Sequence, residues 1–197
     1  MKICLGIFAA VIAVAVGFVI IGGNSLEERG QSLPKSPAEF YVPAAQDAFE
    51  AVDTPVFGAL TIDEELYDAY DGVARGIRVG ADVDVSVSVR ERVITVNGTA
   101  VPVTEEMFEL YEAFAQAIDS SGDGEAVITA DVAGDEVKVK VNYRGAAVDE
   151  HGDIVSGVFN ANSVIKGHSV HVRVIVEGEN VSGAIAVDGF RVGTFSG

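Results

Sequence analysis

Residues 126–143 read AVITADVAGDEVKVKVNY, and this stretch is the clearest evidence for a β-sheet in the sequence. Ala126 to Val132 and Val137 to Tyr143 are runs rich in β-branched residues, and Ala133-Gly134-Asp135 separates them. β-branched side chains favour strands, whereas Gly and Asp favour tight turns. The stretch therefore predicts a β-hairpin of antiparallel strands.

The same alternation of apolar and polar residues recurs on both sides of the hairpin. Residues 82–89 alternate Val with Asp and Ser, and residues 93–96 follow them after a turn. Further short strands are expected at residues 154–159, 169–176 and 181–187. Short alternating strands at this spacing are typical of antiparallel sheet. We expect an α+β, sheet-rich domain that resembles a sandwich, with helices on one side or end.

Helical patterns occur in three segments. Pro43 to Val52 starts with Pro and is rich in Ala, and Thr61 to Glu64 fits a capping box before an apolar run. Thr104 is placed to cap a third helix, with Glu105 and Glu106 in its first turn. The apolar residues of this third helix recur on one side, at Met107, Leu110, Tyr111, Phe114 and Ile118. The sequence thus predicts two or three short helices.

The N-terminal run is long enough to cross a bilayer. Ile3 to Gly23 reads ICLGIFAAVIAVAVGFVIIGG, 21 residues without a strongly polar side chain. At ~1.5 Å per residue, such a helix covers the ~30 Å hydrocarbon core. Lys2 precedes the run and Glu27-Glu28 follows it, so the positive-inside rule favours a cytoplasmic N-terminus and an extracytoplasmic C-terminal body. We therefore expect residues 3–23 to be a transmembrane signal anchor in contact with lipid.

Other interpretations of the N-terminus stay open. Ala13-Val14-Ala15 matches an A-x-A cleavage site, although it lies inside the apolar run, and a cleaved signal peptide would use it. The short basic stub that ends at Gly6 resembles a type IV pilin leader. Pilin helices usually carry a glutamate five residues after the cut, and Val11 stands there in this chain.

Composition divides the chain into three parts. Residues 1–23 form the expected anchor, and residues 24–36 (NSLEERGQSLPKS) mix Gly, Ser, Pro and charge as linkers do. Residues 37–197 have the composition of a globular domain, which we expect to be extracytoplasmic.

Acidic residues dominate the charge. The chain has 30 Asp and Glu against 13 Lys and Arg, a formal net charge of −17. Such a charge repels phosphate, so we expect no nucleic-acid partner. Acidic surfaces with few lysines stay soluble in high salt, which favours a halophilic source, cellular or viral. The alternative is an acidic surface that recruits a cationic partner or calcium.

An acidic loop follows the third helix. Asp119-Ser-Ser-Gly-Asp-Gly-Glu125 resembles the first half of an EF-hand or dockerin calcium loop, with oxygens at Asp119, Ser121 and Asp123. Glu125 is a further candidate ligand, and Asp131 lies one place after the position of the closing carboxylate. The resemblance implies a possible calcium site, whereas an ordinary helix-to-strand turn explains the same residues.

Four further motifs match known modification, catalytic or metal-binding patterns. Asn97-Gly98-Thr99 and Asn180-Val181-Ser182 are N-glycosylation sequons. Ser163 and Lys166 match S-x-x-K, but the S-D-N and K-T-G motifs of that family are absent from the sequence. His168 and His171 are three apart in an expected strand, so they should point to opposite faces. We assign no catalytic residue and no cofactor other than the possible calcium.

These observations favour a membrane-anchored extracytoplasmic structural or interaction subunit with a protein partner. The cell envelope, a surface filament and a virion membrane are all compatible with it. A calcium-dependent binding module is the first alternative, and an anchored hydrolase that uses dispersed carboxylates is the second.

Overall fold

The computed structural model describes residues 56–63, 66, 68–69, 82–88, 93–118, 122–132, 135–165, 168–187 and 190–196. The expected membrane anchor, the linker and the expected helix at 43–52 lie outside these residues, as does the turn expected at 90–92. Within the described part of the chain, no helix is long and apolar enough to span a bilayer.

The described residues form a large sheet and one complete helix. In chain order the elements are β1 (Val56–Ile62), β2 (Asp82–Ser88), β3 (Val93–Val96), β4 (Thr99–Pro102), α4 (Glu105–Ile118), β5 (Gly124–Val132), β6 (Asp135–Val148), β7 (Ile154–Ile165), β8 (His168–Glu177), β9 (Asn180–Val187) and β10 (Phe190–Ser196). The strand order in the sheet is β1-β5-β6-β7-β8-β9-β10-β2-β3-β4.

Most strand pairs in this sheet are antiparallel, as the sequence predicts. The expected hairpin is β5 and β6, in which Val132 pairs with Asp135 and Gly124 pairs with Tyr143. From β5 to β10 each strand pairs with the next one along the chain, which is the pattern of a meander. The pairs β1–β5 and β10–β2 are parallel. Strands β1 and β2 both precede the meander in the chain, and they pair with its two edge strands, β5 and β10.

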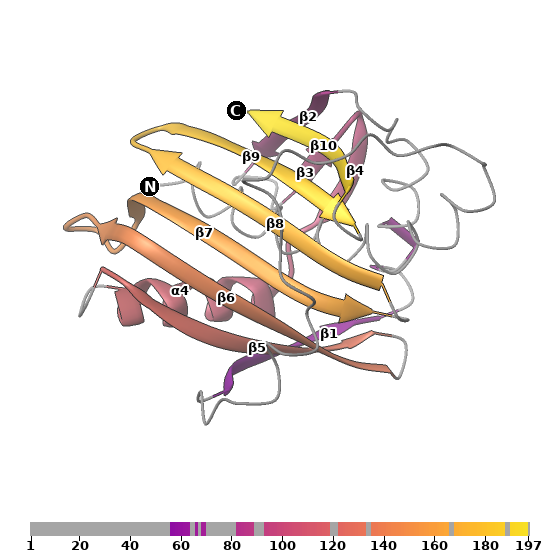
Figure 1. Cartoon of the computed structure of the whole chain (residues 1–197), viewed down its shortest axis with the longest axis horizontal. Coiled ribbons are helices and arrows are strands. Elements are labelled where there is room, and N and C mark those ends of the chain that lie inside the picture. Colours follow the sequence, from indigo (N-terminus) through magenta and orange to yellow (C-terminus); the bar gives the residue numbers. More distant parts are fainter. Residues whose placement is uncertain are drawn as a thin grey trace.

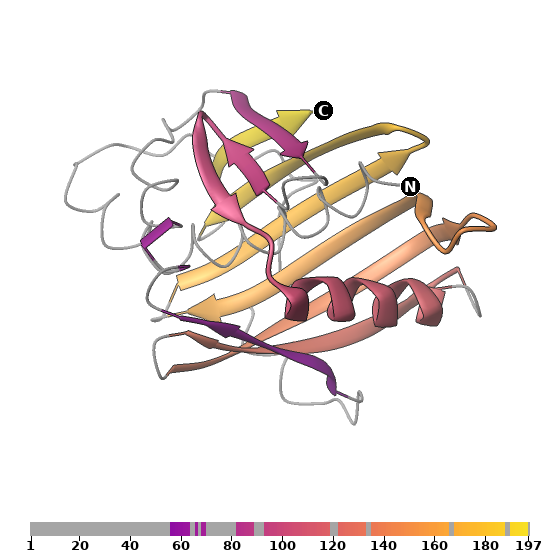
Figure 2. The same ribbon diagram turned by 180° about the vertical axis from the view of Figure 1, so that it is seen from behind.

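The sheet curls around α4 and gives a sandwich-like arrangement. Figure 1 shows the strands running diagonally across one side of the molecule, and Figure 2 shows α4 on the opposite side, across β5, β6 and β7. The strands β2, β3 and β4 form the far end of the curled sheet, above α4 in Figure 2. We call the sheet face that α4 covers the concave face, and the other face the convex face.

Local sequence explains why α4 forms where it does. The Met107 N–H donates to Oγ1 of Thr104 over 3.3 Å, so Thr104 is the N-cap. Glu105 and Glu106 occupy the first turn, where the helix dipole favours negative charge. The apolar side of the helix is buried, and its buried residues are Met107, Leu110, Tyr111, Phe114, Ala115 and Ile118. The prediction for this helix is confirmed.

The core lies between α4 and the concave face. The ring of Phe114 has its centroid 5.3 Å from that of Tyr143 on β6 and 6.0 Å from that of Phe159 on β7. Tyr143 and Phe159 are directly paired across the two strands. Alternate residues of β6 and β8 line the same face and are buried, at Val139, Val141, Val170, Val172, Val174 and Val176. The period-two alternation therefore marks the concave face correctly.

Two parts of the prediction need correction. Asp63, and not Thr61, caps the next segment, because the Leu66 N–H donates to Oδ1 of Asp63 over 2.9 Å. Thr61 instead ends strand β1 together with Ile62. The strands β1, β4 and β10 were not expected from the sequence. Strand β1 reads VFGALTI and lacks alternation, as parallel strands often do.

Candidate functional site

The acidic loop after α4 is tied to a bulge in β6. The Gly145 N–H donates to Oδ1 of Asp123 over 2.7 Å, and the Ala146 N–H donates to the Gly122 carbonyl over 2.7 Å. The register of β6 against β7 shifts between Arg144 and Ala147, which leaves these two N–H groups outside the ladder. One oxygen of Asp123 thus has a structural role as an acceptor of a backbone hydrogen bond. Asp119 and Ser121 lie outside the described residues.

The structure separates Asp131 from the other candidate calcium ligands. Glu125 is the second residue of β5, and its Oε2 lies 2.8 Å from Nζ of Lys140. Asp131 is six residues farther along the same strand, about 20 Å away at ~3.3 Å per residue. There it is paired with Glu136 of β6. Asp123 and Glu125 are close in the chain and exposed, and Asp131 does not join them.

Among the described residues, no three His, Cys, Asp or Glu side chains are grouped to hold a metal ion. A calcium site at Asp119, Ser121, Asp123 and Glu125 stays a prediction. With Asp131 remote, such a site would lack the closing carboxylate of an EF-hand loop.

The two sequon asparagines lie in exposed turns. Asn97 has a φ of 48° and Gly98 a φ of 82°, which makes them the central pair of a tight turn between β3 and β4. Asn180 begins β9 directly after the turn at Gly178 and Glu179. Both side chains are exposed, as an acceptor of a glycan requires. Glycosylation itself stays a prediction.

Ser163 has a structural role in the concave face. Its side chain is buried, and its Oγ donates to the Lys138 carbonyl over 2.8 Å. This hydrogen bond crosses from β7 to β6 and uses the proton that a nucleophilic serine would have to give to a base. Lys166, the other residue of the S-x-x-K motif, lies outside the described residues.

His171 lies on the convex face and is half-buried. Its Nδ1 lies 2.8 Å from Oδ1 of Asn162, the residue paired with it across β7 and β8. Burial, together with the nearby positive charge of Arg173, lowers the pKa of His171 to about 4. The imidazole is therefore neutral at physiological pH. His168 also lies in β8, as expected.

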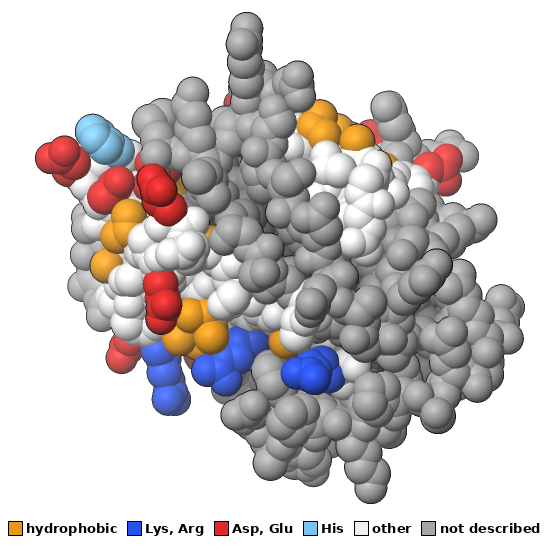
Figure 3. Space-filling view, turned by 90° about the horizontal axis from the view of Figure 1, so that it is seen from above, with side chains coloured by type: hydrophobic (Ala, Val, Ile, Leu, Met, Phe, Trp, Pro, Cys, Tyr) orange, Lys and Arg blue, Asp and Glu red, His pale blue; other side chains and the backbone are white. Residues whose placement is uncertain are grey.

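All Lys and Arg residues of the described part lie on the convex face. Alternation places them there, because their strand neighbours face α4 or are paired with residues that do. The residues are Lys138, Lys140 and Arg144 on β6, Arg173 on β8 and Arg191 on β10. In the space-filling view the visible Lys and Arg side chains gather in one stretch of surface (Figure 3). The convex face also carries acidic side chains, because Glu125, Asp131 and Glu136 alternate with buried residues in the same way, and Glu136 and Glu125 form ion pairs with Lys138 and Lys140.

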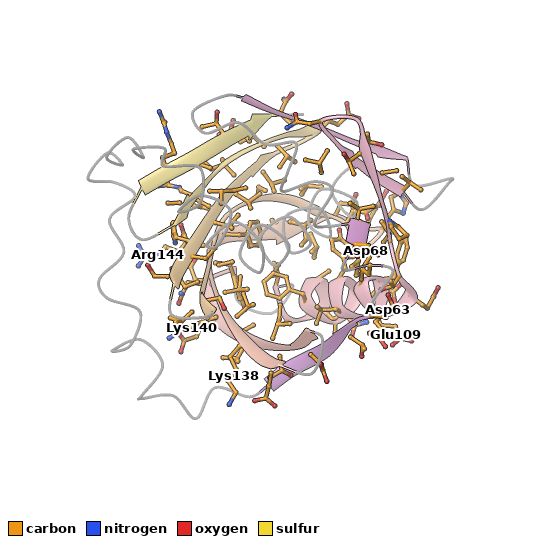
Figure 4. All side chains as sticks on the ribbon, turned by 90° about the vertical axis from the view of Figure 1, so that its right-hand side faces the viewer. Asp63, Asp68, Glu109, Lys138, Lys140 and Arg144 are labelled. Carbon is orange, nitrogen blue, oxygen red and sulfur yellow. The ribbon has the colours of Figure 1, made fainter. Side chains whose placement is uncertain are left out.

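The solvent side of α4, in contrast, carries only acidic charges. Its exposed positions are Glu105, Glu106, Glu109, Glu112 and Gln116. Asp63 and Asp68 are exposed nearby, and Oε2 of Glu106 accepts a hydrogen bond from the Thr61 N–H over 2.8 Å. Figure 4 shows Asp63, Asp68 and Glu109 on one side of the molecule, and Lys138, Lys140 and Arg144 on the outer side of the sheet.

Sequence analysis missed this separation of charge. From Val137 to Gly197 the chain has equal numbers of acidic and basic residues, six of each, so no basic cluster is visible in the composition. The sequence feature that could have revealed this placement is the alternation of apolar and polar residues along each strand. Lys138 and Lys140 stand between the valines of β6, and residues that alternate with buried ones share the outer face.

No protein-family model, curated protein or solved structure matches this chain.

Proposed function

We propose that this protein is a membrane-anchored extracytoplasmic structural or interaction subunit, of a cell envelope, a surface filament or a virion membrane, from a halophilic source. The observation that carries the proposal is the uneven placement of charge on one sheet-rich body: the solvent side of α4 carries only acidic charges, and the described Lys and Arg residues all lie on the convex face, where Lys138 and Lys140 are ion-paired with Glu136 and Glu125. Separated charge of this kind steers and orients a protein partner.

The packing of the concave face supports the same proposal. In the middle of this face, Phe114 is fully buried between Tyr143 and Phe159. The helix fills the space where a curled sheet would otherwise hold a ligand. The surfaces that are offered to a partner are then the convex face and the solvent side of α4.

The proposal of a membrane anchor rests on the uncharged run from Ile3 to Gly23. Membrane fractionation with protease protection tests it on the full chain. We expect the protein in the membrane fraction, with residues 37–197 digested only by protease added on the extracytoplasmic side. Recovery of a soluble product that lacks residues 3–23 would contradict the anchor and favour a cleaved signal peptide.

A calcium-dependent binding module is the second candidate, and the position of Asp123 and Glu125 favours it. Both side chains are exposed and lie two residues apart where the loop meets β5. Without Asp131 the affinity should be weak, toward the ~10⁻³ M range of extracellular modules. A calorimetric titration that shows no heat at millimolar calcium would exclude this candidate. The anchored hydrolase stays a prediction from the sequence.

A further inference from the structure

The turn between β3 and β4 contains an asparagine followed by a glycine, Asn97-Gly98. Every other asparagine of the chain is followed by Ser, Tyr, Ala or Val. The side-chain amide of an asparagine can be attacked by the backbone nitrogen of the next residue, which is one reason why asparagine is thermolabile in proteins. Glycine places no Cβ beside that nitrogen. Asn97 is therefore the asparagine at which this attack is least hindered by the following residue.

The structure leaves the two reacting residues accessible. Asn97 and Gly98 are both exposed, and a Cβ placed on Gly98 would meet no atom within 4 Å. The pairing of β3 with β4 passes directly from Val96 to Thr99, so the backbone nitrogen of Gly98 is outside the ladder. This nitrogen has no ladder hydrogen bond to give up before it can act as a nucleophile, and water can reach both residues.

The closed turn nevertheless holds the reacting atoms apart. Asn97 has a φ of 48°, which belongs to the left-handed region, where ψ is ~47°. With this ψ, Cβ of Asn97 and the nitrogen of Gly98 lie on opposite sides of the Cα–C bond of Asn97. The side-chain carbon Cγ can reach that nitrogen only after a rotation about this bond. Because the rotation takes Asn97 out of the left-handed conformation, attack requires the turn to open.

The position of the turn makes such opening easy. Strands β3 and β4 have four residues each, and β4 is the last strand in the order of the described sheet. Pro102, which is paired with Val93, has no N–H with which to hold the ladder. Short edge hairpins contribute little stability, and local openings cost much less free energy than global unfolding. The tip of this hairpin should thus open far more often than the domain unfolds.

We propose that Asn97 is a site of spontaneous deamidation, which proceeds when the β3–β4 turn opens. The nitrogen of Gly98 forms a bond to Cγ of Asn97, and the bond between Cγ and Nδ2 breaks. Nδ2 leaves as ammonia together with the proton of the Gly98 N–H, and a cyclic imide remains. Solvent water then opens the ring at one of its two carbonyl carbons, which gives either aspartate or isoaspartate. Each product carries one more negative charge than the original residue.

Deamidation would also decide the fate of the first sequon. The leaving Nδ2 is the atom to which an N-glycan is attached, so a residue 97 that has lost it can no longer accept a glycan. The two products should differ in their effect on the hairpin. Aspartate tolerates the left-handed conformation. Isoaspartate lengthens the main chain by one atom, so the two-residue turn cannot close in the same register. This inference does not depend on the membrane anchor or on a partner.

The experiment follows deamidation in the unglycosylated full chain, held in detergent micelles at mildly alkaline pH in heavy-oxygen water. Peptide mass spectrometry measures the replacement of NH₂ by OH, and the oxygen label excludes reaction that occurs later, during digestion. The same chain unfolded in guanidinium chloride gives the rate without a closed turn. Asn180 is the internal control, because it is exposed but is followed by Val181. The variant Asn97→Gln keeps an amide but has to form a larger ring.

In the folded chain we expect Asn97 to react about tenfold or more faster than Asn180, and about tenfold or more slower than in the unfolded chain. Asn97→Gln should stay intact at this position. Methylation by an isoaspartyl methyltransferase should locate isoaspartate at residue 97. An Asn97 that stays intact in the folded chain while the unfolded chain reacts completely would overturn the proposal. Equal rates at Asn97 and Asn180 would overturn the role of Gly98, and equal rates in folded and unfolded chains would overturn the control by the turn.

Discussion

At the scale of single residues, an aspartate in the acidic loop matches a calcium ligand in the sequence and accepts a backbone hydrogen bond in the structure. Asp123 stands where a calcium loop places a ligand, yet its Oδ1 accepts the Gly145 N–H over 2.7 Å. Asp149 has a similar role in the β6–β7 turn. The Asp153 N–H donates to Oδ1 of Asp149, and this hydrogen bond lowers the pKa of the Asp149 carboxyl. In both turns the carboxylate accepts a backbone hydrogen bond that the strands leave unmade.

The first residue-scale prediction concerns Asp123. Replacing it by Ala should lower the free energy of unfolding by about 1–3 kcal/mol, because a bulge N–H loses a charged acceptor. Asp123→Asn should cost less, since the amide oxygen can still accept. Urea unfolding with and without millimolar calcium measures both changes. A loss of stability seen only in calcium would contradict the structural role and support the metal site.

His171 provides the second residue-scale prediction. Its pKa is lowered to about 4 in the folded protein, against an ordinary value near 6.5. Between these values the unfolded chain binds a proton that the folded chain does not, so stability rises with pH across this window. Below about pH 4 the two states bind the same number of protons at this residue. The effect amounts to at most about 3 kcal/mol.

The measurement is the difference in unfolding free energy between the unchanged chain and His171→Gln at a series of pH values. Glutamine does not titrate, so the difference should shrink as the pH falls from about 6.5 to 4. Glutamine can keep a hydrogen bond with Asn162. A difference that is constant with pH would mean that His171 titrates normally.

At the scale of elements, α4 organises the curled sheet. A two-residue turn joins β3 to β4, and α4 follows at Glu105 and brings Phe114 against β6 and β7. Phe114 is fully buried, whereas Glu112 on the same helix is exposed. The helix therefore holds together strands that are distant along the chain, and its apolar side stabilises the domain more than its own propensity does.

Phe114→Ala should accordingly lower the free energy of unfolding by about 3–5 kcal/mol, because it leaves a cavity between two aromatic rings. Glu112→Ala removes a side chain of similar length from the same helix, and its effect should stay within about 0.5 kcal/mol. Chemical denaturation monitored by circular dichroism compares the two. Similar losses from both variants would mean that α4 is not packed as the structure has it.

At the scale of the whole molecule, net charge governs the response to salt. A formal charge of −17 on a chain of this size destabilises the compact state through self-repulsion. The charge is unevenly distributed, because the described basic residues all lie on the convex face. Salt should therefore affect the stability of the folded chain.

We expect the body from about Pro37 onward to fold on its own, and its unfolding midpoint to rise steeply from low to molar salt. Screening of like charges stabilises the folded state, and the Debye length falls from ~30 Å at 0.01 M to ~3 Å at 1 M. Thermal unfolding followed by circular dichroism gives the midpoint, and sucrose serves as an uncharged control. A midpoint that does not change with salt would remove the argument for a halophilic source.

Local sequence patterns were enough to predict the main helix and the central hairpin. Thr104 with its apolar periodicity predicted α4, and the valines around Ala133-Gly134-Asp135 predicted the β5–β6 hairpin. These features depend on neighbours a few residues apart, so spacing and propensity are enough to reveal them. In β6 and β8, alternation also separated the buried side of the strand from the outer one.

Contacts between residues that are distant along the chain became visible only in the folded protein. Strand β1 pairs in parallel with β5, and β10 pairs in parallel with β2, although no local pattern joins them. It is likewise the sheet that separates Asp131 from Asp123 and gathers Lys138 and Arg173 on one face. Such contacts depend on how the sheet curls and which strands become neighbours, and these follow from burying one shared core.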